Sequence, residues 1–359
     1  MDFTNKTPLA ASLSVGSPPG AERRIGAILA KATYRLPDRP AEDRALELET
    51  QEPIPLFDED EETDLGLRPR DDLVRRDEAF EVILLGAAHT PGGHPEAATL
   101  VTLRLGEVRR QLLVVGDRRW KDGLGRSTMT EPEPFTRMPL TWARAFGGTA
   151  PVDIDEGATV DVSHPKNKAG RGFDAEGAAE DLADTFETPS GYPVVKNERL
   201  LPNLEDPDDR IRKPTDEPEP KCWATLPLSS GLHTQRVLDG MDEDEITSEA
   251  LIQQDGLLYR AHPDWVIERP PKNAQLLLVN AAPGGRWDLT LPALRVVFDY
   301  INDGRTATRE LMPQMLVLYP EEKRLTLTYR KPFTYPFEGG AERGIRLRTE
   351  DGWYADSPS

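Results

Sequence analysis

Apolar and polar residues alternate along several stretches of the chain, which is the pattern expected of half-buried β-strands. The first stretch runs from Ile25 to Leu36, with an apolar face on one side and Lys31 and Arg35 on the other. A turn around Gly106 joins two later stretches into a predicted β-hairpin. The strands predicted after the first lie in AFEVILLGAAHT, TLVTLRLG, RRQLLVVGDRRW, QLLLVN, LRVVFDYI, QMLVLYP and KRLTLTYR. Turns between the later strands are predicted at Asn302–Gly304 and at Pro320–Glu321.

These patterns predict a mainly β protein, made of antiparallel β-sandwich-like halves joined by long loops rich in Gly, Pro and acidic residues, with few short helices. The 33 prolines and 28 glycines agree with many turns. One helix is predicted at Asp174–Phe186. Both ends show a lone strand, a longer apolar strand and a hairpin whose second arm begins with two cations, so a duplicated β unit is one option. The expected regions are a flexible N-terminal segment (1–20), an N-terminal β region (21–150), a loop-rich connection with motif blocks (151–275) and a C-terminal β region (276–359).

The charge of the chain narrows the choice of partners. Its 63 Asp and Glu exceed its 44 Lys and Arg, and the net charge of -19 repels nucleic acid and anionic membranes. The acidic runs Asp58–Glu62 and Asp242–Glu245 are expected to be solvated loops that could steer a basic partner. No apolar run approaches the roughly 20 residues that span a bilayer, and the N-terminus lacks the apolar core of a signal peptide. We therefore expect a cytoplasmic protein with no nucleic-acid and no membrane partner.

No group of residues in the sequence predicts a catalytic or metal site. The five histidines lack the spacing of metal ligands, and the single Cys222 can form neither an intrachain disulfide nor a paired-cysteine zinc site. The segment KDGLGRST lacks the lysine of a phosphate-binding loop, and Cys222 has no histidine nearby in sequence, so a buried or idle thiol is expected. We predict a protein that is not an enzyme and has no cofactor and no metal. A hydrolase with an unrecognised acidic site is the enzymatic alternative.

Three blocks combine glycines with aromatic residues, prolines and polar groups: MPLTWARAFGG (138–148), SHPKNKAGRGF (163–173) and LPNLED (201–206). Such residues fix loop backbones, and fixed loops on a β scaffold are common sites of recognition. In a purely structural interpretation, the aromatic side chains fill the core and the polar side chains join the loops by hydrogen bonds. The candidate partner-binding or loop-fixing residues are Trp142, Arg144, Phe146, Gly147, Gly148, His164, Asn167, Gly170, Gly172, Phe173, Pro202, Asn203 and Glu205.

The order of AKATYRL, GDRRW, MPLTWARAFGG, HPKNKAGRGF, LPNLE and LYPEEKRLTLTYR resembles a bacterial family, a domain of unknown function encoded in type VI secretion gene clusters. The resemblance extends from about Ile25 to Arg330. It implies an adaptor or chaperone that loads a toxic effector onto the spike complex, the valine-glycine-repeat trimer with its PAAR tip. Two features depart from the family pattern: Lys168 stands where the family has proline, and the chain runs from Asn280–Pro283 almost directly to LPAL.

The favoured function is therefore a non-enzymatic adaptor whose partners are a secreted effector protein and the spike or tip proteins. A structural component of a contractile injection particle is the first alternative, and the hydrolase is the second. We expect the partner to bind near Trp142, either in an aromatic groove or as a strand added to a free sheet edge.

Overall fold

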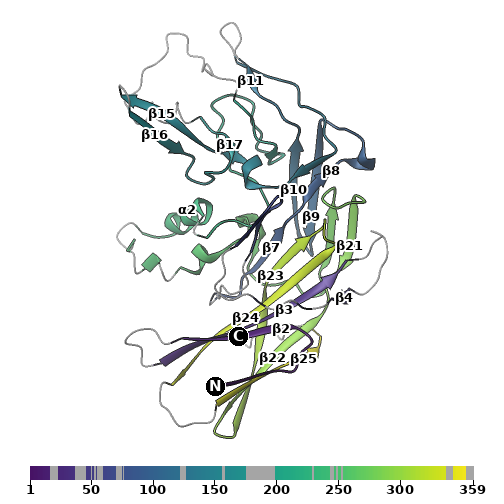
Figure 1. The fold of residues 1–359 in the computed structure, drawn as a ribbon, viewed down its shortest axis with the longest axis vertical. Helices are drawn as coiled ribbons and strands as arrows, with labels where there is room; N and C mark the ends of the chain where they lie inside the picture. The colour runs from purple at the N-terminus through teal and green to yellow at the C-terminus, as the bar shows by residue number, and fades with distance from the viewer. Residues whose placement is uncertain are drawn as a thin grey trace.

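The computed structural model describes residues 1–16, 23–36, 46–49, 51, 54, 60–69, 75, 77–121, 127–155, 158–174, 199–228, 230–242, 246–247, 250–251, 254–336 and 343–352. Within this part of the chain the protein is mainly β with few short helices, which confirms the predicted fold class (Figure 1). The described strands form one sheet of ten strands, one of five and five separate pairs.

The ten-stranded sheet follows the order β1, β25, β22, β23, β24, β3, β2, and β4, β7 and β19 join it beside this path. The long strand β23 holds it together, because its first half pairs with β22 while its second half pairs with β24 on one side and with β7 on the other. A β-bulge between Pro313 and Met315 separates the two halves. The strands are β1 (Asp2–Asn5), β2 (Ala10–Gly16), β3 (Arg23–Arg35), β4 (Glu47–Leu48), β7 (Phe80–Leu84), β19 (Val266–Ile267), β22 (Leu294–Asn302), β23 (Arg305–Tyr319), β24 (Arg324–Pro336) and β25 (Arg343–Asp351).

The five-stranded sheet follows the order β18 (Leu204–Glu205), β10 (Val108–Val115), β9 (Ala98–Leu105), β20 (Gln275–Val279) and β21 (Arg286–Thr290). Strands β9 and β10 are the predicted hairpin, closed by a turn in which Gly106 has a positive φ of 57°. The predicted turns at Asn302–Gly304 and at Pro320–Glu321 are confirmed as well, since they join β22 to β23 and β23 to β24.

Several of the smaller strand pairs lie at the end of the molecule that carries the five-stranded sheet (Figure 1). The remaining strands are β5 (Glu61–Thr63), β6 (Gly66–Arg68), β8 (Ala87–His89), β11 (Trp120–Lys121), β12 (Thr128–Met129), β13 (Arg137–Pro139), β14 (Phe146–Gly147), β15 (Thr149–Asp155), β16 (Ala158–Ser163) and β17 (Arg171–Gly172). The helices are η1 (Pro91–Gly93), η2 (Trp142–Arg144), α2 (Gly231–Asp239), η4 (Asp255–Leu258) and η5 (Pro263–Trp265).

The N-terminal and C-terminal β regions share both large sheets. Strand β3 pairs with β24 over the whole of its length, from Arg23 opposite Pro336 to Arg35 opposite Arg324. Strand β9 likewise pairs with β20, which follows it by about 170 residues in the chain. The regions that follow one another in sequence are therefore interleaved in space.

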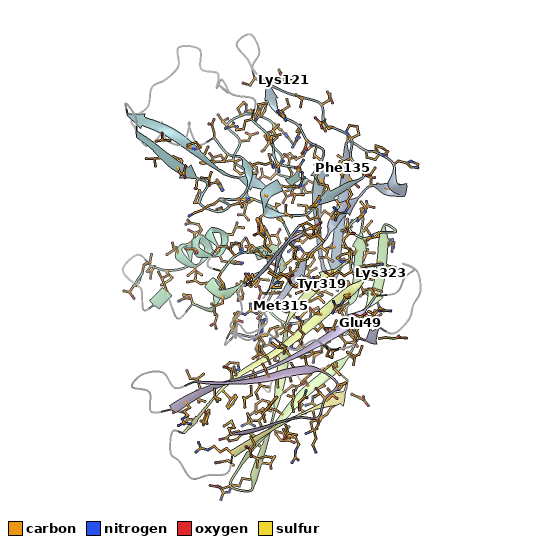
Figure 2. The ribbon with its side chains drawn as sticks, viewed as in Figure 1. Glu49, Lys121, Phe135, Met315, Tyr319 and Lys323 are labelled. Atoms are coloured by element: carbon orange, nitrogen blue, oxygen red, sulfur yellow. The ribbon has the colours of Figure 1, made fainter. Side chains whose placement is uncertain are left out.

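The alternation along β3 has the predicted physical basis. Ile28, Ala30, Ala32 and Tyr34 are all buried, and their side chains join one hydrophobic core that extends through both large sheets. Figure 2 shows Met315 and Tyr319 of β23 near the middle of the molecule, and both belong to this core.

One local expectation needs correction, and one lies outside the described residues. The loop-rich connection includes the short helix α2, which was not predicted at this position. The buried residues of α2 are Leu232 and His233, so the helix lacks the long apolar stripe that would indicate it in the sequence. The acidic run 58–62 is not wholly solvated, because Asp60 is paired with the buried guanidinium of Arg260. The predicted helix at Asp174–Phe186 falls almost entirely outside the described residues.

Candidate functional site

The three motif blocks, which are distant in sequence, meet beside the five-stranded sheet. The third block supplies β18, which pairs with β10 at Leu113 and Val114. The first block is joined to the second by the parallel pair β14 and β17, and to the third by a bridge between Ala145 and Leu204. We call residues 138–148, 163–173 and 201–206 the loop platform.

Aromatic side chains anchor the first block in the core. Trp142 is 8% exposed, and its Nε1 donates a hydrogen bond to the carbonyl oxygen of Ala224 at 3.0 Å. Its ring is stacked on that of His262, with 6.1 Å between the ring centroids. Phe146 lies in a second, smaller cluster, against which the half-buried Phe173 packs. The position of Trp142 in the loop is therefore fixed by both its apolar ring and its polar nitrogen.

Asn167 joins the second block to the first from a buried position. Its Nδ2 donates to the carbonyl oxygens of Trp142 and Phe146, both at 2.9 Å, and its own carbonyl oxygen accepts from the backbone nitrogen of Gly148 at 2.9 Å. Gly147 must be glycine here, because its φ is +134° and a Cβ would lie 2.2 Å from the Asn167 carbonyl oxygen. Gly170 is equally confined, since a Cβ there would lie 2.5 Å from Nδ2 of Asn167.

His164 fills the space between two aromatic rings of the platform. Its ring makes edge contacts with Phe146 and Phe173, with centroid distances of 5.2 and 5.3 Å. Burial, together with the nearby charge of Lys166, lowers the pKa of His164 to about 4. The imidazole is therefore neutral at pH 7 and serves as a packing group.

Asn203 joins the third block to the first and to the sheet. It is fully buried, its Nδ2 donates to the Val115 carbonyl oxygen and to the Asp117 carboxylate at 2.9 Å each, and its Oδ1 accepts from Arg144 at 2.9 Å. The backbone nitrogen of Asn203 also donates to the carbonyl oxygen of Arg144 at 2.8 Å. One amide thus joins its own chain segment to two others, which is how a buried polar side chain specifies a single loop arrangement.

Glu205 holds the far end of the third block. Its buried carboxylate pairs with Arg118 at 2.5 Å and accepts from Arg210 and from the backbone nitrogen of Ile211 at 3.4 Å each. Pro202 packs on Gly172, where a Cβ would lie 2.8 Å from the proline ring. These contacts place the predicted polar residues in loop-fixing positions.

Few of the candidate residues reach the surface of the platform. The side chain of Arg144 is 26% exposed, whereas Trp142, Asn203 and Glu205 are too deeply buried to touch a partner directly. The exposed residues are their neighbours in sequence, Ala143, Pro165, Lys168 and Ala169.

A local excess of positive charge lies at the platform. Arg144 and Arg171 approach the single carboxylate of Asp117 at 3.6 and 3.7 Å. Burial and the neighbouring Arg144 lower the pKa of Arg171, and Asp117 opposes that shift. Asp117 and Arg118 were not among the predicted candidates, although they belong to the GDRRW motif that contributes to the family resemblance.

A second buried polar cluster, centred on Glu81 of β7, was not predicted from the sequence. The Glu81 carboxylate accepts from Arg75 and from the backbone nitrogens of Arg260 and Ala261. The guanidinium of Arg75 lies over the ring of Tyr259, 4.5 Å from its centroid. No sequence spacing indicates this cluster, because Arg75 and Glu81 lie about 180 residues from Arg260 and Ala261.

The described residues hold little that resembles a reactive centre. Among them, no three His, Cys, Asp or Glu side chains lie close enough to hold a metal ion. Cys222 is buried, as predicted, and its Sγ donates to the Leu140 carbonyl oxygen at 3.3 Å. Burial raises the pKa of this thiol to about 12. In the part of the chain that the structure describes, no helix has the length and apolar character to cross a membrane.

Comparison with known proteins gives one family match. Residues 21–330 match the family model described as "Uncharacterized protein conserved in bacteria (DUF2169)". No curated protein and no solved structure matches the chain. The matched range includes the whole loop platform.

Proposed function

The chain belongs to the DUF2169 family of conserved bacterial proteins, and on that premise we propose that it is a non-enzymatic adaptor for another protein. The adaptor binds a secreted effector and loads it onto the spike and tip proteins of a type VI secretion system or a related contractile injection system. The motif order of the sequence, which resembles proteins encoded in such gene clusters, supplies the choice of partner.

The loop platform is the observation that carries this proposal. Its three loops are held by buried amides and carboxylates whose hydrogen bonds go to platform backbone, to the end of β10, and to Asp117 and Arg118, which follow that strand. A recognition surface built on fixed loops binds without the entropic cost of ordering them. Loops that are fixed in this way therefore support a docking role.

The exposed chemistry of the platform indicates what the partner presents. Ala143, Pro165 and Ala169 are small apolar residues exposed on the platform, and Lys168 is an exposed cation in the same block as Arg171. A partner surface with small apolar residues and one or more carboxylates complements this arrangement.

Capture from co-expressed neighbours tests the proposal. The tagged chain is co-expressed with the effector and spike genes encoded beside its own gene, and the captured proteins are identified by mass spectrometry. We expect the effector to be captured in stoichiometric amount. Failure to capture any of these proteins would refute the adaptor function, and retention of the chain in purified injection particles would indicate a structural component.

A surface variant then locates the contact. Lys168 is exposed, and Thr149 donates a hydrogen bond to its backbone carbonyl oxygen, which a change of the Lys168 side chain does not remove. Lys168→Glu therefore leaves the loop-fixing bonds intact. We expect it to weaken capture by about tenfold, since a charge reversal within an interface costs about 1 kcal/mol or more. The matched control is Lys121→Glu on β11, an exposed lysine at the end of the molecule shown in Figure 2. Equal capture by both variants would exclude the platform as the contact.

A further inference from the structure

Strand β2 forms a long free edge of the ten-stranded sheet. Its residues Ala10–Gly16 pair with β3 on one side, from Ala10 opposite Lys31 to Gly16 opposite Ile25. On the other side, no described residue exchanges a backbone hydrogen bond with this strand. Strand β1 precedes it by one turn but pairs with β25, so the two neighbouring strands enter different parts of the sheet.

This edge lacks the features that normally protect a free edge from pairing with another chain. The sequence of β2 is AASLSVG, with no charge and no proline in seven residues. Three other free edges of the two large sheets are protected in the described part of the protein. The first half of β23 carries Arg305 and Arg309, β24 carries Pro332 where it leaves β23, and β21 carries Arg286 and Asp288.

The apolar row of the core continues onto β2 and is left incompletely covered there. Ala11 and Leu13 stand opposite Ala30 and Ile28, which are fully buried, yet both are only half-buried while packing against the core. Val15, the next residue of this row, is 49% exposed, the largest fraction among the exposed large apolar residues described. A further strand with apolar residues at alternate positions would cover this row and satisfy the free backbone groups at the same time.

The surrounding charge selects the kind of strand that fits. Strands β2, β3 and β24 contain no Asp or Glu, in a chain with 63 such residues. Arg23 of β3 lies beyond Ile25 at one end of the paired stretch, and Lys331 of β24 stands opposite Ile28 of β3. A second copy of β2 would bring these cations toward each other, whereas a neutral or acidic strand would not.

We propose that the β2 edge accepts an extended segment of the protein captured by this adaptor, with apolar residues at alternate positions and neutral or acidic residues between them. This inference rests on the proposed function, and it adds a second contact to the loop platform. The segment extends the sheet beside β2, and its backbone supplies most of the binding energy while Leu13 and Val15 select its apolar side chains.

The test uses the full chain and the effector encoded beside its gene. Val15→Lys places a charge on the apolar row at the free edge, where it opposes strand addition. The matched control is Val160→Lys on β16, because Val160 is 46% exposed and lies outside the ten-stranded sheet. We expect Val15→Lys to lower the effector affinity by about tenfold or more, and the control to change it by less than about threefold.

Hydrogen exchange on the wild-type complex provides a second readout that needs no variant. The outward amides of residues 10–16 should exchange at least about tenfold more slowly in the complex than in the free chain, because they gain backbone acceptors. Unchanged exchange there, or undiminished binding by a folded Val15→Lys variant, would overturn the edge proposal while leaving the adaptor function intact. If the wild-type chain captures no effector, both proposals fail. The edge proposal would also be overturned if the free chain forms a dimer and Val15→Lys abolishes that dimer, because a second copy of the chain would then be the occupant of the edge.

Discussion

Removal of the Asn167 side chain should loosen the loop platform more than its size suggests. Asn167→Ala removes two hydrogen bonds donated to the Trp142 and Phe146 carbonyl oxygens, at 2.9 Å each, from a site that is 7% exposed. A hydrogen bond contributes about 1 kcal/mol net, and a buried acceptor that loses its partner costs about 1–3 kcal/mol. Because water can reach some of the freed space, we expect the free energy of unfolding to fall by about 2–4 kcal/mol.

The measurement is urea unfolding followed by tryptophan fluorescence, since Trp142 lies directly on the loop that Asn167 holds. The control is Lys168→Ala, an exposed neighbour whose side chain should contribute less than about 0.5 kcal/mol. An Asn167→Asp variant separates hydrogen bonding from volume, because it keeps the shape but exchanges the donating amide for a carboxylate facing two carbonyl oxygens. If Asn167→Ala and Lys168→Ala unfold alike, or if Asn167→Asp is as stable as the wild type, the hydrogen-bond account of the platform is wrong.

Three further predictions follow from buried groups. His164 has a folded pKa of about 4, lowered from an unfolded value near 6.5, so the unfolded chain binds more protons than the folded chain between these pH values. The free energy of unfolding should therefore fall as the pH drops from 6.5 to 4, and the melting temperature of His164→Gln should fall less steeply over this range. An unchanged slope would contradict the buried neutral imidazole. Glu81→Ala removes the buried carboxylate that pairs with Arg75, which keeps its ion pair with Asp77, and it also removes the acceptor of two backbone nitrogens. The free energy of unfolding should fall by about 3–5 kcal/mol, whereas Glu350→Ala at a half-exposed position of β25 should lower it by less than about 1 kcal/mol, as measured by denaturant unfolding. Equal losses would argue against the Glu81 cluster. The Cys222 thiol should resist a disulfide reagent in the native state and react with one equivalent after unfolding, since burial raises its pKa to about 12; rapid native reaction would show that it is accessible.

The sequence predicts the strands well because their signal is local. Alternation identifies Ile25 to Leu36 as a strand, which the structure has as β3, and the glycine-containing turns identify the β9–β10 and β22–β23 hairpins. The sequence does not predict that β3 pairs with β24, because alternation indicates which face of a strand is buried but not which distant strand lies beside it.

The candidate residues of the platform were identifiable for a similar reason. Glycine, asparagine and aromatic residues clustered in short blocks indicate loops that need special backbone angles and buried hydrogen bonds, and Asn167 and Asn203 occupy such positions. The pairing of Asp60 with Arg260 and the Glu81 cluster depend on contacts between segments nearly 200 residues apart, so the sequence offers no spacing by which to find them. The unprotected edge at β2 becomes visible only once the free edges of the sheet are known.

The most direct test of the adaptor function is reconstitution from purified components. The effector and spike protein encoded beside this gene are mixed with and without the chain, and the masses of the resulting complexes are measured in solution by light scattering after gel filtration. The account predicts that effector and spike associate stably only when the chain is present, in a complex that contains the chain and the effector. Association of effector and spike at equal strength without the chain, or no binding of the chain to either, would contradict it.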